Sequence, residues 1–194
     1  MDKIIFLDRD GTINEEVEYL YKTSDLVIIP GVPAALKRLK ENGFRLVVVT
    51  NQAGIARGYY SERDVIQLHS YMNNILLKDK AGIDHFFYCP HHPDQGVGIY
   101  KKKCRCRKPD IGMFEMTEDL FQVDKSHSYM IGDKLLDTEA GHKYGIEAIL
   151  VGTGYGKELY AQLAEKEKEK AFDAYAKDME AAVEWILKRE GEKI

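Results

Sequence analysis

A pair of carboxylates near the N-terminus carries the clearest chemistry in the sequence. Asp8 and Asp10 follow the apolar run 4–7, and Gly11 comes directly after them. Alternate residues of an extended segment share one face, so both carboxylates can address one small volume, and Gly11 permits a sharp turn behind them. Two carboxylates that close repel each other unless they share a proton or bind a cation, and Mg²⁺ prefers such oxygen ligands. A strand end closed by an ordinary Asp-Gly turn is the alternative interpretation.

Further polar residues follow other apolar runs of the chain. Thr50 comes after the run 47–49, Asp133 and Lys134 come after the run 129–131, and Lys108 precedes a helical pattern. Each of them alone is more often a cap or turn residue. Together with Asp8 they supply a nucleophile, a hydroxyl donor, a cation and a metal-binding carboxylate. This set suits phosphoryl transfer, in which placed donors and a metal meet the charge of the transferred group.

All three cysteines of the chain fall in one loop, residues 89–108. Cys89, Cys104 and Cys106, with either His91 or His92, supply the four ligands that a structural Zn²⁺ takes. Three reduced thiols without a metal are the alternative. A closed site of this kind would cross-link a loop too polar to form its own core, and it would place the two cations that end the loop over a bound phosphate.

Length and composition describe an ordinary globular protein. The 194 residues suit one domain, residues 1–194, with 44% hydrophobic and 31% charged residues. A net charge of −4 argues against a general nucleic-acid binder. The odd number of cysteines argues against a disulfide framework, and the N-terminus lacks the pattern of a signal peptide, so we expect a cytoplasmic protein with no membrane contact.

Strand and helix patterns alternate along the chain. Continuously apolar runs typical of buried strands span 3–8, 44–50, 85–89, 128–132 and 147–151. Helical patterns span 32–42, 61–77, 111–121 and 135–144, with Ser61 as an N-cap and Gly43 and Gly145 as C-terminal stops. Such alternation predicts an α/β fold with a parallel sheet and helices on both faces, whose ligands bind beyond the carboxyl ends of the strands.

Two segments fall outside this alternation. Residues 90–108 are long, irregular and rich in His, Cys and Lys, which is typical of a functional loop. Beyond residue 156 the chain becomes highly charged. The run 165–170 alternates Glu and Lys and predicts a solvated helical face. A last helix contains Met179, Ala182, Val183 and Ile186.

The ordered motifs resemble those of the haloacid dehalogenase superfamily of phosphatases. They are Asp8-x-Asp10-Gly-Thr, then Thr50, then Lys108, then Gly132-Asp133 with Asp137, and they cover essentially the whole chain. The resemblance implies a three-layer, Rossmann-like parallel sheet without a cap domain and with an inserted zinc loop at about 89–108.

The same resemblance implies a role for each motif residue. Asp8 would attack phosphorus to form an aspartyl-phosphate, and Asp10 would protonate the leaving oxygen and then activate water. Thr50 and Lys108 would hold the phosphoryl oxygens. Asp8, the backbone carbonyl of Asp10, and Asp133 would bind the catalytic Mg²⁺.

Within the superfamily, the cysteine loop resembles that of a small group containing heptose bisphosphate phosphatases and histidinol-phosphate phosphatases. The resemblance implies that His91 is the fourth zinc ligand, beside Cys89, Cys104 and Cys106. The segment 50–58 and the longer loop favour the heptose enzymes, which remove the C7 phosphate and retain the C1 phosphate. The residues implied to bind substrate are Glu16, Val17, Glu18, Tyr19, Asn51, Gln52, Ala53, Arg107 and Lys134.

Two departures from the group concern substrate choice. Val17-Glu18-Tyr19 stands where a His-Gly-Tyr style segment is usual, and Ala53 replaces a common serine. We expect the chemistry to survive both changes. The preference for one anomer need not survive them, because a misfit of about 1 to 3 kcal/mol shifts discrimination by roughly 10- to 200-fold.

Two other classes of protein fit parts of the pattern. A phosphoacceptor receiver module also groups acidic residues, a Thr and a Lys, but carries its phosphoacceptor later in the chain. A nucleic-acid-binding zinc protein is suggested by Lys101–Lys103, but this basic cluster is local, and we expect these lysines and His92 to be solvated. We therefore expect a monomeric enzyme acting on a small sugar phosphate, with no nucleic-acid partner.

Overall fold

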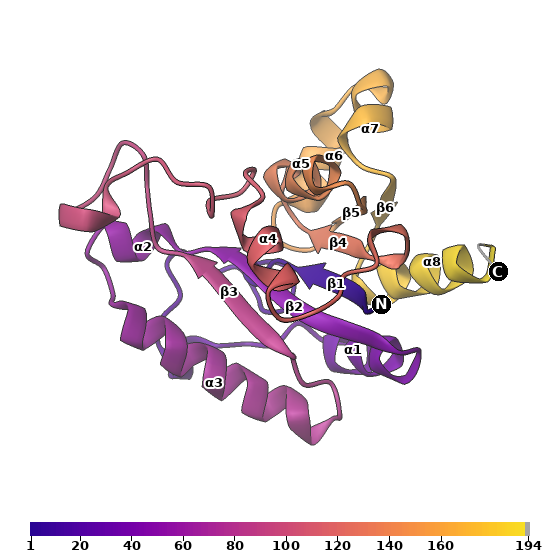
Figure 1. Ribbon diagram of the computed structural model, residues 1–194, viewed down its shortest axis with the longest axis horizontal. Coiled ribbons are helices and arrows are strands. Elements are labelled where there is room, and N and C mark those ends of the chain that lie inside the picture. The colour runs from indigo at the N-terminus through magenta and orange to yellow at the C-terminus, as the bar shows by residue number, and fades with distance from the viewer. Residues whose placement is uncertain (193–194) are drawn as a thin grey trace.

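The computed structural model describes residues 1–192 and contains a parallel six-stranded sheet with helices on both faces (Figure 1). The strands lie in the order β3-β2-β1-β4-β5-β6. They are β1 (Lys3–Leu7), β2 (Phe44–Asn51), β3 (His85–Cys89), β4 (Tyr129–Gly132), β5 (Glu147–Val151) and β6 (Ala174–Ala176). The helices are α1 (Val32–Glu41), α2 (Ala53–Ala56), α3 (Glu62–Lys78), α4 (Gly112–Glu118), α5 (Leu135–Tyr144), α6 (Gly156–Gln162), α7 (Glu165–Ala171) and α8 (Met179–Glu192).

Strand β1 lies in the middle of the sheet. Leu7 at its end pairs with Val48 of β2 on one side and with Ile131 of β4 on the other. The backbone N–H of Asp8 continues this pairing and donates to the carbonyl of Ile131 at 3.0 Å. Because all three strands are parallel, the residues that follow them meet at the same end of the sheet. The predicted convergence of these strand ends is confirmed.

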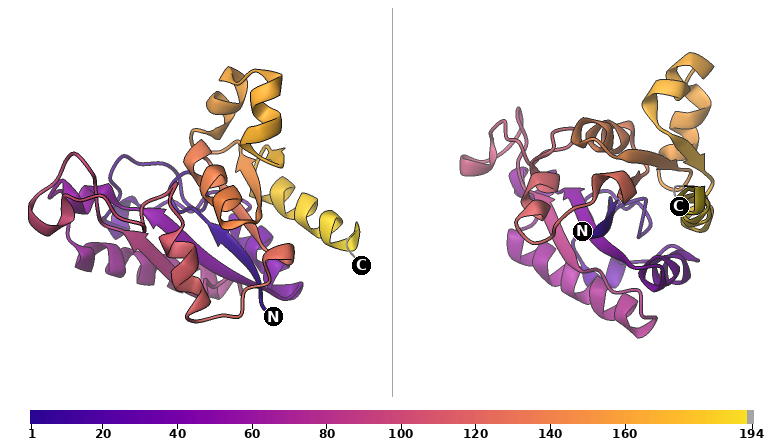
Figure 2. Two further views of the ribbon diagram at one scale, coloured as in Figure 1. Left: turned by 45° about the horizontal axis from the view of Figure 1, so that its top comes forward. Right: turned by 45° about the vertical axis from the view of Figure 1, so that its right-hand side comes forward.

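Alternate residues of β1 pack on opposite faces of the sheet. Ile5 and Leu7 belong to the apolar layer formed with α1, the second half of α3, and α8. Ile4 and Phe6 belong to the layer formed with α4 and α5. Figures 1 and 2 show these helices on their two sides of the sheet. Strands buried on both faces explain the continuously apolar runs, and they confirm the predicted three layers.

The helix ends follow the predicted signals. Ser61 caps α3, and its hydroxyl accepts from the backbone N–H of Asp64 at 3.3 Å. Gly145 ends α5 with a φ of 92°, and Gly43 follows α1 with a φ of 82°. Both glycines adopt the left-handed conformation that a helix C-terminus commonly uses.

Three elements lie outside the predictions. Strand β6 has three residues and α2 has four, which are too short to show a periodic pattern. Helix α6 precedes the charged run 165–170, where no helix was predicted. Helix α4 ends at Glu118, three residues before the predicted end.

The long loop after β3 extends away from the sheet beside α2 (Figure 1). It contains a 3₁₀ turn, Gly98–Tyr100, and its lysines, Lys101–Lys103, are exposed as expected. Helix α7 buries none of its residues, so the predicted solvated face is confirmed. Across residues 1–192, no helix has the length and apolar character needed to cross a membrane.

Candidate active site

A cavity of about 360 Å³ opens where β1, β2 and β4 end. Residues from five distant parts of the chain line it, including Asp8 and Asp10 after β1 and Lys134 after β4. The lining residues are Asp8, Asp10, Glu16, Glu18, Tyr19, Thr50, Asn51, Gln52, Ala53, Gly54, Tyr60, Arg107, Lys108, Lys134, Leu136 and Tyr155. The two N-terminal carboxylates therefore address one volume.

A buried lysine of the cavity lining contacts two buried carboxylates, and a third buried carboxylate lies beside them. Lys108 Nζ lies 2.9 Å from Asp8 Oδ1 and 2.6 Å from Asp137 Oδ1. Asp8, Asp133 and Asp137 each place a carboxylate oxygen within 4.8 Å of the others. Asp133 and Asp137 are fully buried, and Asp8 is 5% exposed. Negative charge therefore exceeds positive charge in a small volume that water barely reaches.

The pKa values of these groups follow from their burial and from each other. Burial and the charge of Asp8 raise the pKa of Asp133 to about 8. Burial raises the pKa of Asp137 to about 6, although Lys108 opposes the rise. Burial also acts on Asp8, but there Lys108 and Lys134 outweigh it and hold its pKa below the ordinary value. Asp8 is thus the carboxylate of the three that the lysines keep ionised.

The three carboxylates fit a hard divalent cation. Asp133 Oδ1 is buried and has no hydrogen-bond partner among residues 1–192. Its other oxygen, Oδ2, accepts from the backbone N–H of Tyr155 at 3.0 Å. Gly11 and Gly154 lie against this carboxylate, and a Cβ on either glycine would come within 2.3 Å of Oδ2. An oriented carboxylate with a free oxygen, beside two others, is the donor set that Mg²⁺ takes.

Asp10 lines the same cavity but is held separately from these three carboxylates. Its Oδ1 accepts from Arg9 and from Asn14 Nδ2, the latter at 3.0 Å, and its Oδ2 accepts from Gln52 Nε2 at 3.1 Å. The side chain is 16% exposed, on the side of the cavity. A carboxyl group in this position can exchange protons with a molecule bound in the cavity.

The residues at the end of β2 and directly after it contact the rest of the site as well as the cavity. The Asn51 amide makes two hydrogen bonds to the backbone of Lys108, at 3.0 and 3.1 Å. The Gln52 amide donates to Thr50 Oγ1 as well as to Asp10, and its oxygen accepts from the Tyr60 hydroxyl at 2.8 Å. Asn51 and Gln52, both expected to bind substrate, therefore also fix the positions of Lys108 and Asp10.

The segment 16–19 forms one wall of the cavity. Glu16 pairs with Lys134 at 2.9 Å, and Glu18 and Tyr19 line the cavity beside them. Tyr19 has a φ of 58°, a conformation that is uncommon outside glycine and frequent at binding sites. Val17 departs from the expectation, since it is 38% exposed and absent from the cavity lining. Its neighbours in the chain turn inward, which leaves Val17 on the outside.

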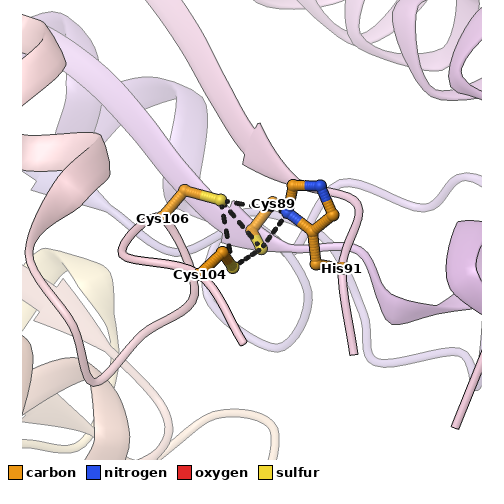
Figure 3. A group of neighbouring side chains, drawn as sticks. All are labelled: Cys89, His91, Cys104 and Cys106. Atoms are coloured by element: carbon orange, nitrogen blue, oxygen red, sulfur yellow. Dashed lines mark hydrogen bonds between the residues drawn. The ribbon is translucent and has the colours of Figure 1, made fainter. Parts of the chain in front are cut away.

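The three cysteines and His91 point toward one another (Figure 3). The sulfur atoms lie 3.2 to 3.5 Å apart, and His91 Nδ1 lies 3.3 Å from Cys106 Sγ and 3.7 Å from Cys89 Sγ. A tetrahedral Zn²⁺ with Zn–S bonds of about 2.3 Å needs ligand atoms about 3.8 Å apart, close to this spacing. Hydrogen bonding from Cys89 lowers the pKa of Cys106 to about 5, so one ligand is ready as a thiolate. The cluster could hold a metal ion.

His92 lies outside this cluster. Its Nδ1 accepts from the backbone N–H groups of Asp94 and Gln95, at 3.2 and 3.0 Å. Expected to be merely solvated, His92 instead closes the turn that follows it.

Sequence reasoning gave no role to several residues that shape the site. Asp137 appeared only as a motif position, yet it is the nearest anion to Lys108. Arg9 stands between the two predicted carboxylates and is fully buried, and His69 contacts it from α3. A charged residue at the end of an apolar strand was the available signal for Arg9. The local sequence gives no sign that Arg9 contacts a residue 60 positions away.

Comparison with known proteins gives consistent matches. The HAD-hydrolase-like family matches residues 105–182. The D-glycero-beta-D-manno-heptose-1,7-bisphosphate 7-phosphatase of Haemophilus ducreyi is 46% identical over 154 residues, which is 78% of this chain and 84% of the relative. A D-glycero-alpha-D-manno-heptose-1,7-bisphosphate 7-phosphatase of Photorhabdus laumondii is 42% identical over 154 residues, 79% and 84% of the two chains.

Solved structures of heptose bisphosphate phosphatases also match this chain. The D,D-heptose 1,7-bisphosphate phosphatase from B. bronchiseptica, complexed with magnesium and phosphate, superposes with a TM-score of 0.81. It is 32% identical, and the match covers 96% of this chain and 99% of that one. The corresponding enzyme from Burkholderia thailandensis superposes with a TM-score of 0.66 at 28% identity, over 96% and 99% of the two chains.

Proposed function

The chain belongs to the D-glycero-D-manno-heptose-1,7-bisphosphate 7-phosphatase family of HAD-like hydrolases, and on that premise we propose that it removes the C7 phosphate of this sugar bisphosphate. The product would be heptose 1-phosphate, a precursor in nucleotide-activated heptose biosynthesis. The observation that carries the proposal is the cavity itself, whose lining combines Asp8, Asp10 and Lys108 with the further cations Arg107 and Lys134.

The first half of the reaction transfers the phosphoryl group to the protein. Asp8 attacks phosphorus, the bond from phosphorus to the C7 oxygen breaks, and Asp10 gives its proton to that oxygen. Lys108 and Thr50 hold the phosphoryl oxygens. The lowered pKa of Asp8 supports its role as the nucleophile, because only the ionised form attacks.

The second half restores the enzyme. Asp10, now ionised, takes a proton from water as this water attacks the aspartyl-phosphate, and phosphate leaves as the bond to Asp8 breaks. Asp8, the backbone carbonyl of Asp10, and Asp133 would hold Mg²⁺, which when bound neutralises charge as one anion approaches another. The buried Oδ1 of Asp133, which accepts no hydrogen bond among the described residues, supports this assignment.

The other lining residues would recognise the rest of the substrate. Arg107 and Lys134 are the cations for the C1 phosphate, as charge-assisted donors. We propose that Glu16, Glu18 and Tyr19 contact the sugar, with Asn51, Gln52 and Ala53 forming the opposite side. Lys134 Nζ pairs with Glu16 at 2.9 Å and lies 3.8 Å from Asp133 Oδ1, and its three N–H donors allow it to bind an anion as well.

We assign a structural Zn²⁺ to Cys89, His91, Cys104 and Cys106. All four positions would be filled by protein ligands, which leaves no place for water or substrate and is typical of a structural site. Arg107 and Lys108 follow Cys106 directly in the chain. The metal would thus hold both cations at the cavity.

Some properties follow as part of the same proposal. We expect residues 1–194 to act as one domain and as a monomer, in the reducing environment of the cytoplasm. The cysteines support that environment, since all three are free and lie at one metal-binding cluster. Light scattering at several protein concentrations would test the monomer.

One experiment tests the function. The protein is incubated with the α and β anomers of heptose 1,7-bisphosphate and with histidinol phosphate, with and without Mg²⁺, and released phosphate is measured. We expect Mg²⁺-dependent release of one phosphate from at least one anomer, with histidinol phosphate much slower. Equal rates on unrelated phosphomonoesters would overturn the heptose assignment, and faster release from histidinol phosphate would favour that substrate instead.

A further inference from the structure

Arg9 is a fully buried cation bound to the carboxylate next to it in the chain. Its side chain is 0% exposed. Nε and Nη2 donate to Asp10 Oδ1 at 3.0 and 2.9 Å, and Nη2 also donates to Asp10 Oδ2 at 2.7 Å. Nη2 further reaches the carbonyl of Leu20 at 3.3 Å. A buried charge is tolerated when it is paired and hydrogen-bonded in this way.

The remaining side of the guanidinium faces His69 of α3. Arg9 Nη1 lies 3.2 Å from His69 Nε2. A guanidinium can only donate, so His69 Nε2 must be the unprotonated ring nitrogen and accept this bond. His69 is 4% exposed, and its ring stacks on Phe86 with centroids 4.7 Å apart. Burial first, and the charge of Arg9 second, hold the pKa of His69 well below 6.5, so the ring is neutral.

These contacts form a chain that ends at the cavity. His69 on helix α3 accepts a hydrogen bond from Arg9, and Arg9 donates hydrogen bonds to both oxygens of Asp10. Asn14 and Gln52 bind Asp10 from its other sides. Proton transfer requires the carboxyl group within hydrogen-bond reach of the reacting oxygen, and a misplacement of about 1 Å can cost about 100-fold in rate.

We propose that Arg9 and His69 are positioning residues that fix the orientation of the Asp10 carboxyl group for its proton transfers, an inference that rests on the proposed function. Neither residue lines the cavity. Their effect passes through Asp10. His69 makes the specific contribution of a neutral acceptor, which turns the guanidinium toward Asp10 and ties it to a helix of the scaffold.

The test compares two substrates whose leaving groups differ in their need for a proton. Heptose bisphosphate releases an alkoxide, which must be protonated, whereas p-nitrophenyl phosphate releases a stable phenolate. In H69M the acceptor is lost. We expect kcat on the sugar substrate to fall by at least about 10-fold, within the range that general acid catalysis contributes, and kcat on the aryl substrate to change much less. H69Q retains an acceptor, and we expect it to restore most of the loss.

Two controls separate positioning from general damage. M72A removes packing from the same helix, in the apolar layer under the sheet, and we expect it to leave the ratio of the two rates unchanged. In a D10N background, H69M should cost nothing further, because the two changes act through one group. Equal losses on both substrates in H69M, or the same loss in the D10N background, would overturn the inference.

A measurement on the unaltered protein stands beside the variants, should H69M not fold. Nitrogen NMR of the histidine rings should show His69 with its proton on Nδ1 and without titration between about pH 5 and 8. A proton on Nε2 would contradict the contact with Arg9. Wild-type protein that hydrolyses neither substrate would overturn the proposed function and this inference with it. Hydrolysis of both with an unchanged rate ratio in H69M would overturn the inference alone.

Discussion

At the scale of single residues, the site concentrates negative charge in a space that water barely reaches. Asp8, Asp133 and Asp137 share one volume with Lys108, and the pKa values of the three carboxylates differ because their partners differ. Burial raises the pKa of Asp8, but Lys108 and Lys134 outweigh it, so Asp8 stays ionised. For Asp133, burial and the charge of Asp8 outweigh Lys134, which lies 3.8 Å from its Oδ1, so the protonated form is favoured. The environment thus separates the pKa values of chemically identical groups, as the proposed roles of nucleophile and metal ligand require.

The first prediction concerns the nucleophile. In D8N the amide cannot form the aspartyl-phosphate, so we expect turnover to fall by at least about 10⁴-fold, as for nucleophile removal in other hydrolases. The fold should persist, because Lys108 keeps Asp137 as a partner. Phosphate release and circular dichroism check both statements. Normal activity in this variant would end the assignment of Asp8.

The second prediction concerns the pH dependence of Mg²⁺ binding. The pKa of Asp133 is raised to about 8 in the metal-free protein, so below that pH the metal must displace a proton. Affinity should therefore rise with pH and level off above about 8, with up to about a tenfold change per pH unit below it. Calorimetric titrations in buffers of different ionisation enthalpy would measure both affinity and proton release. A constant affinity between about pH 6 and 8 would contradict this expectation.

The sequence predicted which candidate site residues lie together, and it did not predict the side chains that hold them. Asp8, Thr50, Lys108 and Asp133 are recognisable because each follows or precedes a regular element at a fixed position. The contact of Arg9 with His69 depends on how α3 packs under the sheet. Local patterns cannot carry that information, since the two residues are 60 positions apart.

At the scale of elements, the parallel strands bring distant residues together and the helices hold them there. Strand β1 supplies Asp8, β2 supplies Thr50 and Asn51, and β4 supplies Asp133. The apolar runs and the caps of α3 and α5 made these elements predictable. Strand β6 and helix α2 were not predicted, because segments of three or four residues are too short to show a periodic apolar pattern.

A third prediction concerns α3 and the pH dependence of stability. His69 is neutral in the folded protein and has its ordinary pKa near 6.5 when unfolded, so the unfolded state gains protons below that pH. Stability due to His69 is therefore present above about 6.5 and declines as pH falls, by up to about 1.4 kcal/mol per pH unit. Relative to H69Q, the wild type should lose about 1 kcal/mol between about pH 7 and 5.5.

Urea unfolding of both proteins across this range measures the difference. The comparison with H69Q removes the opposite contributions of Asp133 and Asp137, whose pKa values are raised in the folded state. A difference that does not change with pH would show that His69 titrates alike in both states.

A fourth prediction concerns the cysteine loop. H91A removes one metal ligand, whereas H92A removes a neighbouring ring that binds only backbone N–H groups in the described contacts. We expect zinc affinity to fall by at least about tenfold in H91A and to stay within about threefold in H92A. Competition with a chromophoric chelator measures both. Equal affinities in the two variants would exclude His91 as a ligand.

At the scale of the whole molecule, one sheet gathers residues from distant parts of the chain around a single cavity. The lining comes from the segment after β1, the end of β2, the cysteine loop and the start of α5. The fold class and the meeting of the candidate site residues were accessible from sequence because both follow from strand order. The wall of the cavity was less accessible, and Val17 faces outward because an irregular segment has no period that assigns its faces.

A fifth prediction tests whether Arg107 recognises the C1 phosphate. Arg107→Gln removes a cation from the cavity, so kcat/KM for the bisphosphate should fall by about 10- to 100-fold, the range for loss of a charged contact. For heptose 7-phosphate, which lacks the C1 phosphate, the fall should be much smaller. Arg105→Gln is the matched control, since Arg105 is exposed and pairs with Glu115 at the surface. Equal losses on both substrates would show that Arg107 does not recognise the C1 phosphate.

The double hydrogen bond from Asn51 to the backbone of Lys108 has an evolutionary consequence. Lys108 is anchored by strand β2 and by two carboxylates, so its position does not depend on the path taken by residues 92–103. Lengthening a surface loop costs little entropy, about 0.6 kcal/mol for each doubling. We therefore expect descendants of this protein to gain or lose residues in that stretch while Lys108 keeps its contact with Asp8.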